Sequence, residues 1–273
     1  MGHGLARNPL VKLSRNRILY FLRQNEIELD GHKMYLDRED SLGLSKHRVF
    51  EPFETEICKR DIKPGDIIVD IGANIGYYTL IFARLVGSKG KVYAFEPDPT
   101  NFELLRANVE ANGYKNVVLE QKAVSSKEWE ATLHLSQGNL GDHRLYDSLD
   151  DRDTILVEAI ALDRYFENIE REINFIKMDI QGAEPGAFAG MVSLVENNDK
   201  LKMTTEFWPA GLQRFGTSGS DYLDMLENSG FHLYWIDEAQ KQLRLLDASS
   251  ILEMYPNEPE MHINLLLVKE PLP

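Results

Sequence analysis

Residues 64–79 read PGDIIVDIGANIGYYT, and this stretch decides the fold of the chain. The apolar run at 67–69 is β-branched and continuous, which is typical of a strand buried on both faces. Asp70 ends this strand, Gly72 and Gly76 permit a tight turn, and the apolar spacing that follows predicts a helix. Because the free N–H groups at the start of a helix favour a polar or anionic partner, we expect this turn to face a ligand.

Length and composition bound the class of protein. The chain has 273 residues, 43% of them hydrophobic, enough for one large α/β domain, alone or with additions. Its single cysteine, Cys58, excludes an intramolecular disulfide and fits a reducing compartment, so we predict a cytoplasmic protein. A net charge of −14 disfavours nucleic acids and anionic membranes as partners. No apolar run approaches the roughly 20 residues of a transmembrane helix, and the basic N-terminal segment lacks the apolar core of a signal peptide.

The first 62 residues are predicted to form an N-terminal extension packed on a main domain over 63–273. Helical spacing covers 9–24, and strands at 26–29 and 33–36 flank Asp30-Gly31, a strong hairpin signal. Residues 41–49 resemble a loop, and 50–62 are predicted to be helical. Because the extension ends just before the opening strand, we expect it to lie over the ligand cleft.

Strands and helices then alternate along the main domain, which predicts a doubly wound, mostly parallel sheet. The last two strands have no long helix between them, so we expect the last one to be antiparallel. The polar stretch at 137–153 is long for a connection and is predicted to be a functional loop. The strands that we predict after the opening one cover 91–97, 117–124, 131–136, 173–180, 201–208, 231–237 and 263–269.

Acidic residues end four of the predicted strands: Asp70, Glu96, Asp179 and Glu206. In open α/β sheets ligands bind beyond the carboxyl ends of the strands, so these side chains are expected on one rim. Each one alone is better explained as a turn or helix-capping residue. Four together repel one another unless a ligand or cation separates them, which favours a cationic ligand.

Glu96 indicates a ribose in that ligand. It lies roughly 20 residues after Gly76, the offset at which an acidic residue binds ribose hydroxyls in nucleotide-binding βαβ units. A carboxylate accepts hydrogen bonds from both hydroxyls. The dinucleotide fingerprint G-x-G-x-x-G is absent, and so is a Tyr-x-x-x-Lys pair for hydride chemistry.

Three motifs in this order resemble the FkbM family of class I S-adenosylmethionine-dependent methyltransferases: DIGANIG at 70–76, FEPDP at 95–99 and KMDIQGAE at 177–184. The resemblance covers residues 50–269. It implies a Rossmann-like sheet of seven strands with the last one antiparallel. It also implies S-adenosylmethionine as cofactor, S-adenosylhomocysteine as product, and O-methylation of a sugar, glycolipid or natural-product hydroxyl.

The cofactor-binding residues follow from the strand ends and this resemblance. The glycine-rich turn is assigned to the methionine part, Glu96 to the ribose, and residues after the second and third strands to the adenosine. A glutamate of the helix at 50–62, Glu51 or Glu54, is expected to reach the same ligand. The predicted set is Glu54, Asp70, Gly72, Ala73, Asn74, Gly76, Tyr77, Glu96, Pro97, Lys122, Ala123 and Asp179.

Methyl transfer from a sulfonium needs alignment, and a sugar-type hydroxyl must also lose its proton. The candidate bases are Asp179, Glu206 and His143, and His143 is expected in a loop that covers the acceptor. The alternative is that Asp179 and Glu206 share a divalent cation, although we predict no metal site.

Other readings stay open. A different acceptor, such as a small metabolite, keeps the methyltransferase assignment. A nicotinamide-dependent oxidoreductase and a non-catalytic ligand-binding protein are the alternatives from other classes.

Overall fold

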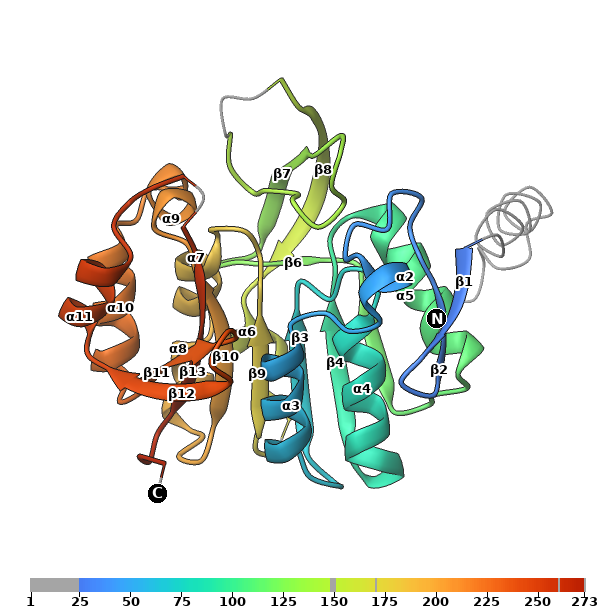
Figure 1. The fold of residues 1–273 in the computed structure, drawn as a ribbon, viewed down its shortest axis with the longest axis horizontal. Helices are drawn as coiled ribbons and strands as arrows, with labels where there is room; N and C mark the ends of the chain where they lie inside the picture. The colour runs from blue at the N-terminus through green and yellow to red at the C-terminus, as the bar shows by residue number, and fades with distance from the viewer. Residues whose placement is uncertain (1–24, 148–150, 170, 260, 273) are drawn as a thin grey trace.

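The computed structural model describes residues 25–147, 151–169, 171–259 and 261–272. The helix predicted over 9–24 lies outside these ranges. Figure 1 shows a central sheet with helices on both sides and a small second sheet that projects beyond the strand ends at the top of the view. Within the described ranges, no helix combines the length and the apolar character needed to cross a membrane.

The central sheet confirms the predicted α/β fold. Five neighbouring strands are parallel, and β13 runs antiparallel between β10 and β11. The seven expected strands are all present, and the described chain adds an eighth, β12, at the edge, in the connection between the last two predicted strands. In spatial order the strands are β12 (Gln242–Leu246), β11 (His232–Asp237), β13 (Ile263–Val268), β10 (Lys202–Phe207), β9 (Phe175–Met178), β3 (Ile67–Ile71), β4 (Lys91–Phe95) and β5 (Val117–Glu120).

Strand β3 is buried along its whole length because helices cover both faces of the sheet. Val69 and Ile71 pack into one hydrophobic core with residues of α7 (Glu184–Ala189) and α10 (Gly219–Asn228). Ile68 points the other way, into a core with α3 (Pro52–Asp61) and α4 (Tyr77–Val86). This explains why the sequence shows a continuous apolar run instead of alternation.

The described part of the N-terminal segment packs on the main sheet's helices. The predicted hairpin is confirmed as β1 (Glu26–Leu29) and β2 (His32–Tyr35), and the predicted helix as α3 (Pro52–Asp61). The amide of Asn108 pairs with both the N–H and the C=O of Tyr35. The stretch predicted as loop contains one short helix, α2 (Leu44–His47), and the domain boundary at residue 62 stays a prediction.

The small sheet corrects two predictions. The single strand expected over 117–124 is wrong, because the chain leaves β5 at Glu120 and joins the small sheet as β6 (Ala123–Val124). The strand expected at 131–136 is β7 (Trp129–Leu135), and it pairs with β8 (Asp153–Ile160), which was not predicted. The remaining helices are α4 (Tyr77–Val86), α5 (Pro99–Ala111), α6 (Leu162–Tyr165), α8 (Val192–Glu196), α9 (Pro209–Phe215), α11 (Ala248–Met254) and a 3₁₀ turn (Gly87–Lys89).

Candidate active site

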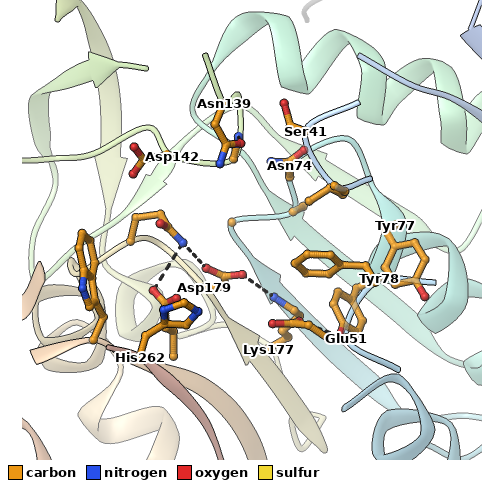
Figure 2. A pocket seen from close by; sticks show the side chains of 18 of the residues that line it. Ser41, Glu51, Asn74, Tyr77, Tyr78, Asn139, Asp142, Lys177, Asp179 and His262 are labelled. Carbon is orange, nitrogen blue, oxygen red and sulfur yellow. Dashed lines mark hydrogen bonds and ion pairs between the residues drawn. The ribbon is translucent and has the colours of Figure 1, made fainter. Parts of the chain in front are cut away.

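Two adjoining cavities open at the carboxyl ends of β3, β4, β9 and β10, and Figure 2 shows side chains that line the larger of them. The larger has a volume of about 400 Å³ and the smaller about 50 Å³. Both lie where ligands bind in open α/β sheets. The residues that line both cavities are Gly72, Asn74, Gly141, Asp179 and Gln181.

The turn from β3 to α4 forms the wall between the cavities. Gly72 has φ 77°, and a Cβ there would lie 2.0 Å from the carbonyl oxygen of Asp179, so only glycine fits. Ala73 and Asn74, two of the predicted cofactor contacts, line the larger cavity, and their role stays a prediction. Gly76 lines neither cavity; its φ is 95° and a Cβ would meet Leu105 at 2.7 Å, so this glycine serves the packing of α4 on α5.

Asp70 lines the larger cavity, and one of its carboxylate oxygens has no hydrogen-bond donor among the described residues. Its side chain is 1% exposed, and Oδ2 accepts a hydrogen bond from the Thr79 hydroxyl. Oδ1 has no hydrogen-bond partner among the described residues. Burial raises the pKa of this carboxyl, and the nearby Lys177 ammonium opposes that shift. A buried carboxylate oxygen without a donor fits a ligand that brings its own cation.

Glu96 lies in the smaller cavity, held by the backbone. Its Oε2 accepts from the N–H of Asn74 at 2.8 Å, and its Oε1 accepts from the N–H of Asp98 at 3.0 Å. Burial raises the pKa of Glu96 to about 8. The predicted adenosine-side residues Pro97, Lys122 and Ala123 line this same cavity. Its apolar walls come from Ile71, Phe95, Val124, Leu133, Leu140, Leu145 and Ile180.

His143 also lines the smaller cavity and not the larger one. Its Nδ1 accepts a hydrogen bond from the N–H of Ser136 at 3.0 Å, and its Nε2 lies 3.9 Å from Oδ1 of Asp98. Burial lowers the pKa of the imidazole. His143 therefore lines the same cavity as Glu96, whereas Glu206 lines the larger cavity.

The larger cavity holds a chain of polar contacts that joins β9 to β10 (Figure 2). The side-chain amide of Gln181 donates to Oδ1 of Asp179 at 2.9 Å and to Oε2 of Glu206 at 3.4 Å. Nζ of Lys177 lies 3.4 Å from Oδ2 of Asp179. Burial and then the Asp179 carboxylate raise the pKa of Glu206 well above its usual range. Burial alone would lower the pKa of Lys177, but the surrounding carboxylates, Asp179 foremost, raise it.

The N-terminal segment contributes Glu51 to the larger cavity, whereas Glu54, one helical turn later, does not line it. Oε2 of Glu54 accepts from the Asn264 amide at 2.6 Å. Burial, followed by the neighbouring Glu51 carboxylate, raises the pKa of Glu54 to about 8. Tyr77, also a predicted cofactor contact, lines the larger cavity, and its role stays a prediction. Of the two glutamates considered for the ligand, the structure brings Glu51 to the cavity.

Several lining residues were not predicted from the sequence. They come from loops without a local motif, and only their place in the fold brings them together. Within the described ranges, no group of three or more His, Cys, Asp and Glu side chains is arranged to hold a metal ion, so the alternative of a shared cation lacks a third ligand there. The unpredicted residues of the larger cavity include Ser41, Asn139, Asp142, Arg144 and His262.

Comparison with known proteins points to one family. A family model described as the methyltransferase FkbM domain matches residues 70–233. The chain is 48% identical over 48 residues to the 31-O-demethyl-FK506 methyltransferase FkbM of Streptomyces tacrolimicus, covering 18% of each protein. It is 43% identical over 58 residues to a protein-L-isoaspartate O-methyltransferase of Aeropyrum pernix, covering 21% of this chain and 22% of that protein. These matches thus span about a fifth of each relative's length.

Solved structures give a broader but weaker likeness. The crystal structure of an S-adenosylmethionine-dependent O-methyltransferase from Thermotoga maritima aligns with 91% of this chain and 78% of its own. Its sequence identity is 15% and the TM-score is 0.44.

Proposed function

Because the chain belongs to the methyltransferase FkbM domain family, we propose that it transfers a methyl group from S-adenosylmethionine to a hydroxyl of a neutral sugar, glycolipid or natural product. One observation carries the proposal. Two cavities share the glycine-rich turn as a wall, with Glu96 in the smaller one and Asp70 in the larger. This pairing suits a ligand with a ribose at one end and a cation at the other.

The residues present fit this cofactor. Glu96 and the apolar walls of the smaller cavity would hold the adenosine, and His143 is assigned to this side as well. Asp70, Ala73 and Asn74 would hold the aminoacyl part in the larger cavity. When bound, the cofactor supplies a methyl group that the sulfonium already activates.

The charge of the larger cavity supports a neutral acceptor. Carboxylates lining it outnumber the cationic side chains, which are Lys177 and Arg144. Both cations already interact with acidic residues, Lys177 with Asp179 and Arg144 with Asp142. An anionic acceptor, such as the carboxylate of an isoaspartyl peptide, would be repelled there. The carboxylates are Glu51, Asp70, Asp142 and Asp179; the Glu206 carboxyl also lines the cavity but favours its protonated form.

Asp179 is the proposed general base. Its side chain is 28% exposed, it lines the cavity, and it is ion-paired with Lys177. Glu206 prefers its protonated form because its pKa is raised, so it suits hydrogen bonding to the acceptor better than proton removal. Gln181 bridges the two carboxyl groups and would orient them.

Transfer of a labelled methyl group tests the acceptor class. Purified protein is incubated with methyl-labelled S-adenosylmethionine and a panel of neutral glycans, hydroxylated natural products, small metabolites and an isoaspartyl peptide. We expect label on a neutral hydroxyl. Label confined to the peptide carboxyl would contradict the proposed acceptor but keep the methyltransferase assignment.

Location and partners complete the proposal. A cytoplasmic location rests on the single cysteine, Cys58, whose thiol is buried. A small-molecule or glycan acceptor, not a nucleic acid, fits the net charge of −14.

A further inference from the structure

Glu51 precedes α3 at the N-cap position but does not cap it. Its backbone adopts φ 44° and ψ 72°, and its side chain makes no capping hydrogen bond. The N–H groups of Phe53 and Glu54 are instead bound by the carboxylate of Glu238, at 3.0 and 2.8 Å. Since Glu238 satisfies these donors, the carboxylate of Glu51 is free to turn into the larger cavity.

The backbone of Glu51 shares an unusual conformation with other cavity residues. Non-glycine residues rarely adopt positive φ. Three of the described residues that do so, Glu51, Asn74 and Gln181, line the larger cavity, with φ of 44°, 50° and 56°. Such conformations gather at functional sites, where surrounding contacts hold them.

Neutral groups hold the Glu51 carboxylate in place. Oε1 accepts from the Asn264 amide at 2.6 Å, and Oε2 accepts from the Tyr78 hydroxyl at 3.0 Å. A carboxylate has about four acceptor positions, so each oxygen keeps capacity for another donor. Burial raises the pKa of Glu51, and Lys177 opposes this shift. A further cation in the cavity would favour the ionised form in the same way.

We infer that Glu51, together with Asp70, binds the ammonium group at the aminoacyl end of S-adenosylmethionine. The inference rests on the proposed function and deepens it. Asp70 gives independent support, because its Oδ1 is buried in the same cavity without a hydrogen-bond partner among the described residues. An ammonium carries three donors and matches two such carboxylates. The segment before the main domain thus completes the cofactor site.

Two ligands that differ at this end provide the test. S-adenosylhomocysteine carries the aminoacyl group, whereas 5′-methylthioadenosine has the same nucleoside without it. Calorimetry on the full chain compares the wild type with Glu51→Gln, which keeps the size of the side chain and removes its charge. Glu56→Gln is the matched control, since Glu56 lies on the same helix, is 58% exposed and lines neither cavity.

Glu51→Gln is expected to weaken S-adenosylhomocysteine binding about tenfold or more, with methylthioadenosine binding changed less than about twofold. Glu51→Asp, which keeps the charge, should recover part of the loss, and Glu56→Gln should match the wild type. If the affinity for both ligands falls equally, or if neither affinity falls, the inferred role of Glu51 is overturned. The proposed function is not affected by that result. Wild-type protein that binds neither ligand would overturn the proposed function and this inference with it.

If Glu51→Gln fails to fold, as judged by its thermal unfolding without ligand, Glu51→Asp serves as the test. Its carboxylate lies on a shorter side chain, so the affinity for S-adenosylhomocysteine should fall a few-fold while that for methylthioadenosine does not. An unchanged ratio of the two affinities would contradict the inference.

Discussion

The two halves of the cavity edge are built in different ways. At β3 and β4 the backbone places the functional groups: Glu96 is bound by the N–H groups of Asn74 and Asp98. At β9 and β10 other side chains place them: Gln181 bridges Asp179 and Glu206. The half that we propose for the cofactor is therefore fixed by short motifs, whereas the half that we propose for the acceptor depends on contacts between side chains. Substitutions should separate the two halves in the kinetics.

The largest effect is expected from Asp179→Asn, which tests the acceptor half. Loss of the general base should lower kcat by about 10²–10⁴-fold, while the change in size is small and S-adenosylhomocysteine affinity should stay within about threefold. Steady-state kinetics and calorimetry measure the two quantities. The exposed Asp224→Asn is the matched control. Turnover near the wild-type level would show that Asp179 is not the base.

Glu96→Ala tests the cofactor half and should come next in size. Removing the carboxylate takes away the ribose contact and leaves the N–H groups of Asn74 and Asp98 without their acceptor. We expect a loss of about 2–3 kcal/mol in S-adenosylhomocysteine binding, roughly 30- to 150-fold in Kd. At saturating donor kcat should change little. A large fall in kcat with unchanged Kd would contradict the division into halves.

Alanine variants of two histidines should give smaller effects, and opposite ones on cofactor affinity and on the KM of the acceptor. His143 lines the smaller cavity and His262 the larger. His143→Ala should weaken S-adenosylhomocysteine roughly fivefold and leave the KM of the acceptor unchanged, as expected for about 1 kcal/mol of contact. His262→Ala should raise the acceptor KM and spare the cofactor. The reverse pattern would show that His143 acts on the acceptor and not on the cofactor.

Glu54→Gln should affect stability and its pH dependence, with the smallest effect on binding. Burial, followed by the Glu51 carboxylate, raises the pKa of Glu54 from 4.5 to about 8, so the folded state holds its proton more tightly than the unfolded chain. The stability this proton provides is complete below pH 4.5 and is lost as pH rises towards 8.

The variant should therefore gain stability relative to the wild type between pH 5 and 8, on the order of 2 kcal/mol. Chemical denaturation at several pH values measures this gain, with Glu56→Gln as the control. S-adenosylhomocysteine affinity should stay within about twofold, because Glu54 lines neither cavity. A parallel pH profile for both proteins would show that Glu54 has no raised pKa.

What the sequence predicts well is local. Gly72 and Glu96 sit in motifs whose geometry a few neighbouring residues determine, and the structure places both at the cavities. Between Glu51 and Glu54 the sequence gives no basis for a choice, and the structure places Glu51 at the larger cavity, because Glu238, nearly 200 positions away, binds the first N–H groups of the helix.

Loops and strand changes were harder to predict. Residues 117–124 look like one strand, yet the chain leaves one sheet for another at 121–122. That change sets the small sheet beside the cavities and carries His143 to the smaller one. The course of the chain from β5 into the small sheet depends on the pairing between β7 and β8, and no short sequence motif predicts that pairing.

Calorimetric titration of the wild-type protein with S-adenosylhomocysteine and with NAD⁺ tests the central claim most directly. The two cavities, with Glu96 in one and two carboxylates near the turn in the other, predict binding of S-adenosylhomocysteine at one site per chain and no binding of NAD⁺. Binding of NAD⁺ without binding of S-adenosylhomocysteine would contradict the account.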